Sequence, residues 1–342
     1  MKHLTLWLWL VAILVLGASC RKEICYDHEE HAPRVRLDVQ AEWETVWERD
    51  YGCNWSANWN PEWGWAYTDF IPQPATGIRS LIYKQDGTVH DERNLPADGG
   101  RLYLKEESYS LLFYNNDTEY IVYSGLGEKA NATATTRTIT RNTFTALHGG
   151  ERTINPPDML YGHYVEHFEG ELSTEAMKMP ITLKPLAYTY LIRYEFSAGL
   201  EYVGLARGAL AGMAESVYLH DGHTGDESAT LLYDCTIEPY GAEARIMSFG
   251  VPNHPGDHYS RDAADEEPHY AMNLEVRMTN GLFKTFEFDI TEQMKTQPRG
   301  GVIVVSGLEI TDEEGKEPDP DSGGFDIGVE GWGDAIDVPL PL

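Results

Sequence analysis

The sequence contains few cysteines, and this scarcity limits the ways in which the chain can be cross-linked. Its 342 residues include four cysteines: Cys20, Cys25, Cys53 and Cys235. No pair has the C-x-x-C spacing of a redox motif or of a zinc site, so neither chemistry is indicated. A disulfide between Cys25 and Cys53 is one alternative, and buried thiols at Cys53 and Cys235 are the other.

Basic residues are also scarce. Lys and Arg total 26 against 55 Asp and Glu, which gives a formal net charge of −29 at pH 7. Nucleic-acid binding depends on Lys and Arg side chains that neutralise phosphates, so this balance argues against a nucleic-acid partner. The same charge resists anionic membrane surfaces. Membrane contact would therefore depend on a lipid group and not on a basic patch.

Long apolar runs are absent apart from one near the N-terminus. Leu4–Leu16 is an apolar run of 13 residues with a single Thr, and it follows the short basic start Met1–His3. A bilayer core of ~30 Å needs ~20 apolar residues, so this run is too short to span a membrane. The basic start, the apolar run and the small residues Gly17–Ser19 together predict a secretory signal peptide of residues 1–19.

Cys20 directly follows the small residues of this signal, and the arrangement resembles the lipobox of bacterial lipoproteins. In lipoproteins this cysteine is acylated and becomes the first residue of the mature protein. The position three before the cysteine is usually leucine, whereas this chain has Gly17 there and Leu16 one residue earlier. The resemblance predicts a palmitate-bearing Cys20 and a polar tether of residues 20–33. An ordinary secreted protein that is cleaved nearby is the alternative.

Alternating apolar residues predict many short strands and no long helix. At residues 34–40, Val35, Leu37 and Val39 share one face, as expected of a half-buried strand. The clearest alternation lies in the second half of the chain, where one face carries Tyr188, Tyr190, Ile192, Tyr194 and Phe196. Short strands at regular spacing are typical of β-sandwiches. We therefore expect an all-β fold of two tandem antiparallel β-sandwiches, residues 34–178 and 179–342.

Two stretches predict β-hairpins. Residues 109–114 and 119–124 are rich in β-formers and flank the turn-forming residues Asn115–Asp117. Residues 272–290 flank Asn280-Gly281, which is the strongest short turn signal. We expect both pairs of segments to form antiparallel hairpins.

Six of the nine tryptophans lie between Trp43 and Trp65, among Asn, Gly and Pro residues that follow no single period. Exposed indole rings can stack on sugar rings or anchor a protein interface. This interpretation makes four residues candidates for contact with a glycan or a protein partner: Trp55, Trp59, Trp63 and Trp65. The alternative is that the indoles cover the edge of a sandwich core.

Sequence motifs of catalysis are largely absent. No G-x-S-x-G, P-loop or dinucleotide-binding motif occurs. His163–His167 matches H-x-x-E-H, but that zinc motif requires a helix, and the alternation around it predicts a strand. Histidines four residues apart on a strand are ~13 Å apart, too far to share an ion. Paired catalytic carboxylates cannot be selected among 55 acidic residues. We expect no enzymatic activity, no cofactor and no metal.

Three turn-rich stretches contain side chains that metals favour. Residues 220–226 (HDGHTGD) and 254–258 (HPGDH) combine His and Asp, and we interpret both as surface loops. Residues 319–324 partly match a calcium-binding loop, but Gly323 stands where that loop has a ligand. An exposed acidic turn is the preferred interpretation of this stretch, and weak calcium binding stays open.

Several stretches together resemble a family of Bacteroidota lipoproteins related to fimbrial (type V pilus) anchor and assembly subunits. The stretches are residues 21–28, 34–39 (RVRLDV), 158–164, 181–193, 201–213 and 325–332 (FDIGVEGW). The resemblance implies two tandem transthyretin-like β-sandwiches on a lipid-anchored protein of the cell outer membrane. It also implies donor-strand addition, in which a strand of one subunit fills a groove on the next. The segments to test as donors are residues 34–40 and 325–342.

The sequence therefore supports two functions. The first is a non-enzymatic cell-surface lipoprotein that engages a fimbrial subunit through strand addition or a sandwich interface. The second is a surface glycan-binding lipoprotein that uses the Trp43–Trp65 cluster. Whether the protein faces the periplasm or the outside, its partner, the strand order and the state of Cys25, Cys53 and Cys235 stay open.

Overall fold

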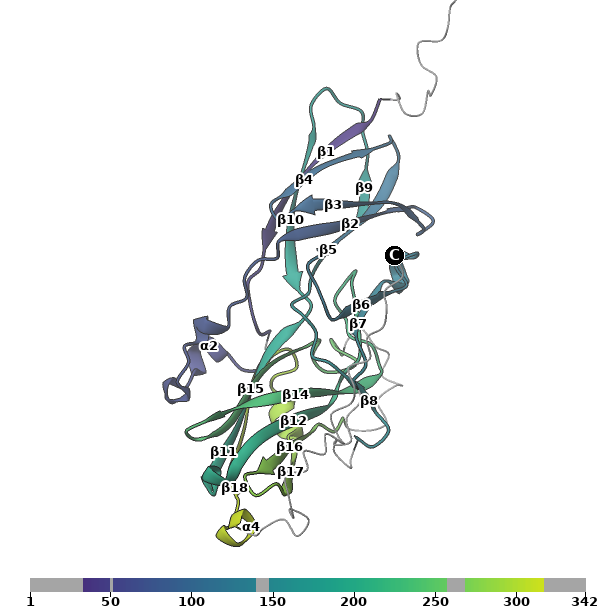
Figure 1. Cartoon of the computed structure of the whole chain (residues 1–342). Coiled ribbons are helices and arrows are strands. Elements are labelled where there is room, and N and C mark those ends of the chain that lie inside the picture. Colours follow the sequence, from purple (N-terminus) through teal and green to yellow (C-terminus); the bar gives the residue numbers. More distant parts are fainter. Residues whose placement is uncertain (1–32, 50–51, 140–147, 257–267, 317–342) are drawn as a thin grey trace, which may run out of the picture.

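The computed structural model describes residues 33–49, 52–139, 148–256 and 268–316, which fold into two β-bodies (Figure 1). Cys20, Cys25 and residues 317–342 lie outside the described residues, and so do Asp257 and His258. Strands dominate both bodies, and the all-β prediction is confirmed. No described helix is long and apolar enough to cross a membrane.

The first body is a seven-stranded sheet that folds into two layers. Its strand order is β3-β2-β5-β9-β10-β1-β4. β9 and β10 share only two paired positions, Lys184 with Gly162 and Pro185 with Tyr161, so the sheet turns a corner there. The strands are β1 (Val35–Trp43), β2 (Gly77–Lys84), β3 (Val89–Pro96), β4 (Gly99–Leu104), β5 (Ser108–Asn115), β9 (Tyr161–Glu169) and β10 (Met177–Pro185).

Strand β1 lies inside this sheet, parallel to β10 and antiparallel to β4. Val35, Leu37 and Val39 are buried in the core of the first body, as their alternation predicted. Both edges of the 34–40 segment are thus paired within the chain. A donor role for this segment would require it to leave its own sheet.

The second body has the strand order β17-β16-β12-β14-β15-β11-β18, and the short strand β8 (Arg152–Ile154) pairs with β14. β10 lies in the first body and β8 in the second, so the chain passes between the bodies more than once. The predicted boundary between residues 178 and 179 stays a prediction. The strands are β11 (Tyr188–Ala198), β12 (Val203–Ala214), β14 (Ser228–Glu238), β15 (Gly241–Ser248), β16 (Ala271–Met278), β17 (Phe283–Asp289) and β18 (Gly301–Glu309).

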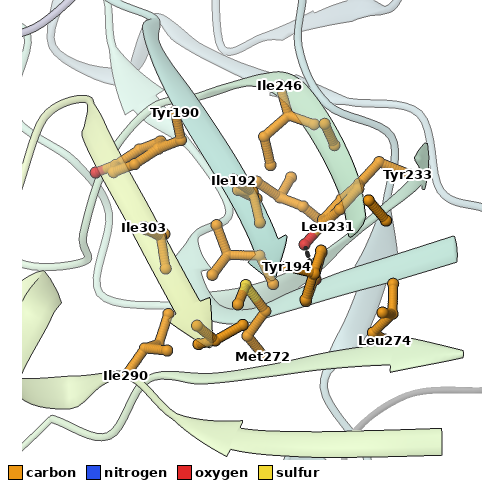
Figure 2. Close-up of a cluster of buried hydrophobic side chains, with 14 of the residues drawn as sticks. Tyr190, Ile192, Tyr194, Leu231, Tyr233, Ile246, Met272, Leu274, Ile290 and Ile303 are labelled. Atoms are coloured by element: carbon orange, nitrogen blue, oxygen red, sulfur yellow. Dashed lines mark hydrogen bonds between the residues drawn. The ribbon is translucent and has the colours of Figure 1, made fainter. Parts of the chain in front are cut away.

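The core of the second body forms around β11. Tyr190, Ile192 and Tyr194 share one face of this strand and belong to one buried cluster with Ile303 of the neighbouring strand β18 and Met272 of β16 (Figure 2). The Tyr194 hydroxyl hydrogen-bonds the Tyr233 hydroxyl at 2.8 Å, so the phenol groups have partners inside an apolar core. The predicted apolar face of residues 188–196 is confirmed as the face that builds this core.

A small third sheet lies at the junction of the two bodies and consists of β6 (Ile121–Ser124), β7 (Thr133–Thr136) and β13 (Val217–Tyr218). β6 pairs with β7, and β5 lies between β2 and β9. The predicted hairpin between residues 109–114 and 119–124 is therefore wrong. The junction is filled by a buried apolar cluster from both bodies: Leu81, Tyr83, Leu112, Tyr114, Ile121, Ala132, Ala134, Leu160, Leu186, Ala187, Ala214, Val217, Leu219 and Phe249.

The hairpin around Asn280-Gly281 is confirmed, because β16 and β17 pair antiparallel on either side of it. The described helices are short, of four or five residues each. They are α2 (Trp55–Asn58), α3 (Thr291–Met294) and α4 (Asp312–Lys316), with 3-10 turns at Pro61–Trp63, Tyr67–Phe70, Lys129–Asn131 and Leu200–Tyr202.

Candidate functional site: the tryptophan segment and the edge of β18

Residues 47–49 and 52–70, here called the tryptophan segment, cover the outer face of the second body. Trp47 and Phe70 are buried against Leu191 of β11 and Val302 of β18. Trp55, Trp59, Trp63 and Tyr67 are partly buried around this cluster. β11 is thereby covered on both faces, by the core on one side and by the tryptophan segment on the other.

The indole rings of this segment cross one another. Trp59 lies edge-on to Trp63, with ring centroids 5.0 Å apart and an interplanar angle of 89°. Trp47 and Trp59 cross at 83°, and Trp55 and Trp63 are tilted by 50°. Edge-to-face packing is the favourable geometry for aromatic rings that form a core. Trp55, Trp59 and Trp63 therefore form a packed cluster and not a flat row.

Trp65 differs from the other three candidates because its side chain is 41% exposed. Its indole N–H donates to Oε1 of Glu243 at 2.9 Å, and the Arg245 guanidinium lies 4.9 Å from the ring centroid. A surface groove of about 480 Å³ opens beside it, lined also by Asp234 and Glu238. An aromatic ring flanked by carboxylates and a guanidinium can contact a polar ligand such as a sugar.

A buried arginine fastens the tryptophan segment to the sheet. Arg193 of β11 is 3% exposed, and its Nη1 lies 3.0 Å from Oε2 of Glu243. The same nitrogen donates to the main-chain carbonyl of Trp63 at 3.0 Å and to the Tyr240 hydroxyl at 2.9 Å. Burial, together with the Glu243 carboxylate, raises the pKa of Tyr240 well above its usual range. Sequence reasoning missed Arg193, although an arginine in an apolar strand is a signal for a buried ion pair.

The outer edge of β18 is covered by side-chain amides where another strand would pair. Gln297 accepts a hydrogen bond from the N–H of Val302 at 2.8 Å and donates to its C=O at 3.0 Å. Gln293 does the same with Val304, at 3.1 Å and 3.0 Å. Each glutamine thus satisfies the donor and acceptor that an edge strand presents. No described strand pairs with β18 on this side.

The other candidate residues are placed as follows. The H-x-x-E-H stretch lies on strand β9, as predicted, with His163 Nδ1 2.9 Å from the carbonyl of Thr182 and His167 Nε2 2.8 Å from Glu169. Burial lowers the pKa of His163. Cys53 is a partly buried thiol. The acylation of Cys20, the calcium-like turn at 319–324 and the donor segment 325–342 fall outside the described residues.

Comparisons with known proteins identify relatives of this chain. Residues 65–234 match a family model described as a domain of unknown function, DUF5119. Over 97% of its length, the chain is 22% identical to a Bacteroides ovatus protein provisionally named fimbrium anchoring subunit Fim4B, of which 96% is aligned. This chain resembles the fimbrial anchor proteins of Bacteroidota. The predicted family resemblance is thereby confirmed.

A solved structure shows the same fold. A crystal structure of a Bacteroides ovatus protein, provisionally classed as an adhesin, superimposes with a TM-score of 0.57 at 18% identity. The match covers 83% of this chain and 97% of that chain, and therefore includes both β-bodies. The fimbrial anchor protein Mfa2 from Porphyromonas gingivalis matches more weakly, with a TM-score of 0.45, 9% identity and coverage of 79% and 90%.

Proposed function

We propose that this chain is a non-enzymatic surface lipoprotein of the fimbrial anchor or assembly type. The observation that carries the proposal is the similarity to the Bacteroides ovatus fimbrium anchoring subunit, 22% identical over 97% of this chain. Since nearly all of both chains is aligned, the similarity extends beyond one shared module. The acidic composition supports attachment through a lipid, because a net charge of −29 offers little attraction to anionic lipids.

The proposed contact with a fimbrial subunit uses strand addition or a sandwich face. Strand addition needs an edge with open backbone groups and pockets for alternate side chains. β17 and β18 are the two end strands of the second body. A strand added to β18 would have to displace the side chains of Gln293 and Gln297. A strand added to β17 would instead cover the partly buried Phe286 and Phe288. These contacts favour β17 as the acceptor edge.

Deletion of the gene tests this function. A strain that lacks the chain should release fimbriae from the cell surface or fail to form them, and full chain isolated from outer membranes should carry a bound fimbrial subunit. Attached fimbriae of normal number in the deletion strain, with no subunit bound to the isolated chain, would contradict the proposal.

The lipid anchor is tested separately. We expect the Cys20→Ala variant to leave the membrane fraction, because a net charge of −29 offers little attraction to anionic lipids and no described helix is long and apolar enough to hold the protein there. Cys25→Ala is the matched control, since it removes a cysteine five residues further along and should stay with membranes. A Cys20→Ala protein that still fractionates with membranes would refute anchoring through Cys20.

Glycan binding is the second candidate function, and Trp65 with its groove is the observation that favours it. Trp55, Trp59 and Trp63 are turned toward one another and toward the sheet, so a sugar ring would stack first on Trp65. A glycan array probed with the full chain should show binding that Trp65→Ala removes. Tyr103→Ala is the control, because Tyr103 is an aromatic side chain of the first body that is 52% exposed. An array without signal, or binding that survives changes at all four tryptophans, would eliminate this function.

A further inference from the structure

The turn after β13 lies at the junction of the two bodies. Tyr218 pairs with β7, and Leu219 is buried in the junction cluster. The turn is tight, since the N–H of Gly222 donates to the C=O of Tyr218 at 2.9 Å and Gly222 has a φ of +76°. A Cβ on residue 222 would lie 2.9 Å from the side chain of Leu186. The turn is therefore packed closely against the segment that links the bodies.

Three side chains with metal-binding atoms converge in this turn. His220 Nε2 lies 3.3 Å from Oδ2 of Asp221, and His223 Nδ1 lies 2.5 Å from Oδ1 of the same carboxylate. The three ligand atoms all lie within 4.8 Å of one another. Bonds of ~2.0–2.2 Å to a tetrahedral ion place neighbouring ligand atoms ~3.3–3.6 Å apart. The separation between His220 and Asp221 already fits, and the one between His223 and Asp221 has to lengthen by about 1 Å. The third separation, between the two histidines, is at most 4.8 Å.

Aromatic rings hold both imidazoles in place. The Tyr218 ring stacks on His223, with centroids 3.9 Å apart and an angle of 14°. His220 is packed edge-on between Tyr218 at 6.0 Å and Tyr164 of β9 at 6.1 Å. His223 is 7% exposed. Side chains fixed in this way lose little conformational freedom when they bind a ligand, which favours affinity.

The sequence alone favoured a surface loop at residues 220–226, because it does not reveal which side chains of the loop are buried. His223 is buried, whereas Asp226 is exposed and lies outside the group of converging ligands among the described residues. Arg299 also approaches the turn, but its Nη2 donates to the main-chain carbonyl of Gly222 at 2.7 Å. It thus helps to fix the backbone that carries the ligands.

We propose that His220, Asp221 and His223 bind a divalent first-row transition ion of the Zn²⁺ class. Two imidazoles and a carboxylate suit Zn²⁺, Ni²⁺ or Cu²⁺, whereas Ca²⁺ and Mg²⁺ prefer all-oxygen sites. The ion replaces the hydrogen bond between Asp221 and His223 and leaves one position for water or for a group from a partner. Because the turn contacts both bodies, the ion fixes their junction. This site is independent of the proposed fimbrial role.

Calorimetric titration with Zn²⁺ tests the site, using the full chain produced without a polyhistidine tag. We expect one ion per chain. His220→Ala and His223→Ala should each weaken binding by at least ~100-fold, since loss of an outer-shell partner alone costs ~10–100-fold. Zn²⁺ should also raise the Tm of the parent chain and leave the Tm of both variants unchanged, because only a ligand that binds the folded state stabilises it.

The matched control is His167→Ala. His167 also lies beside a carboxylate, Glu169, at 2.8 Å, but on the exposed part of β9. This variant should bind Zn²⁺ as the parent chain does. His220 is the less buried of the two ligand histidines, with a side chain 25% exposed, so its variant remains informative if His223→Ala fails to fold. Absence of binding by the parent chain, or binding that His220→Ala leaves unchanged, would overturn the proposal.

Discussion

Gln297 pairs with Val302 as a neighbouring strand would, through one hydrogen bond from the N–H of Val302 and one to its C=O. Both residues are buried. Gln297→Leu keeps the side-chain volume and removes both partners. We expect it to lower the free energy of unfolding by about 2–4 kcal/mol, because each buried backbone group left unsatisfied costs ~1–3 kcal/mol.

Urea denaturation measures this effect, and Gln85→Leu is the control, since Gln85 lies in an exposed turn. The control should change stability by less than ~0.5 kcal/mol. Gln297→Leu should also increase self-association in size-exclusion chromatography, because it uncovers the edge of β18. Equal stability of the two variants would show that the amide contributes nothing to this edge.

We expect a second large loss of stability when the buried ion pair between Arg193 and Glu243 is broken. Arg193→Met leaves the Glu243 carboxylate buried without its cation, and we expect a loss of about 3–5 kcal/mol in stability. The tryptophan segment should loosen at the same time, because Arg193 also binds the carbonyl of Trp63. A red shift of the tryptophan fluorescence of the folded variant would report this.

The matched control is Arg79→Met. Arg79 forms an ion pair of 2.8 Å with Glu92, and the side chains are 34% and 55% exposed, whereas those of Arg193 and Glu243 are buried. Exposed pairs contribute ~0–1 kcal/mol, so this variant should remain close to the parent chain. Similar losses at Arg79 and Arg193 would contradict a special role for the buried pair.

Trp47 and Trp65 should differ sharply in their contribution to stability. Trp47 is 1% exposed and packs against Trp59, Tyr67 and Phe70, so Trp47→Ala should cost about 3–5 kcal/mol. Trp65→Ala removes a partly exposed ring and one hydrogen bond, and should cost about 1 kcal/mol. Guanidinium denaturation of both variants checks this, and equal costs would mean that Trp65 is also a structural residue.

Glu314 predicts a pH dependence. The hydrogen bond from Lys284 lowers the pKa of this carboxyl most, and the hydrogen bond from the N–H of Thr311 lowers it further, so that the pKa falls from its usual value to about 2. Because the folded chain favours the ionised form, the stabilisation is present above pH ~4.5 and is lost as the pH falls toward about 2. Glu314→Gln should therefore be less stable than the parent chain at neutral pH and equally stable near pH 2.

Thermal unfolding between pH 2 and pH 7 measures this dependence. Glu292→Gln is the control, because Glu292 pairs with Lys295 on the surface with its side chain 85% exposed. It should follow the parent curve across the range. A constant difference between Glu314→Gln and the parent chain at all pH values would exclude titration of Glu314 as the cause.

Local signals in the sequence predicted most strands correctly. Asn280-Gly281 fixes a tight turn, and the alternation of residues 188–196 fixes which face of β11 meets the core. The predicted hairpin after Tyr114 was wrong because the side chains of Asn115 and Asp117 form hydrogen bonds with segments distant in the chain and do not close a local turn. Asn115 binds the backbone of Tyr161 and Met159, and Asp117 accepts from the N–H of Thr76. These long-range bonds tie the end of β5 to β9 and to the start of β2.

The candidate sites were harder to predict. Composition identified the tryptophan-rich stretch, but the partial burial of Trp55, Trp59 and Trp63 depends on β11 and β18, which lie more than 100 residues away in the chain. The HDGH turn was visible as a motif. Its convergence depends on Tyr164 of β9 and on Arg299, neither of which is near it in sequence.

The sequence by itself determined the fold class, the apolar faces of the strands and the family resemblance, because these depend on local periodicity and composition. Tertiary structure decided which strands pair, which indoles are covered, and whether the histidines of the turn meet. Pairing and burial arise from contacts between distant segments, and a single pattern along the chain does not encode them. The second face of β11 shows this most clearly, since the tryptophan segment covers it.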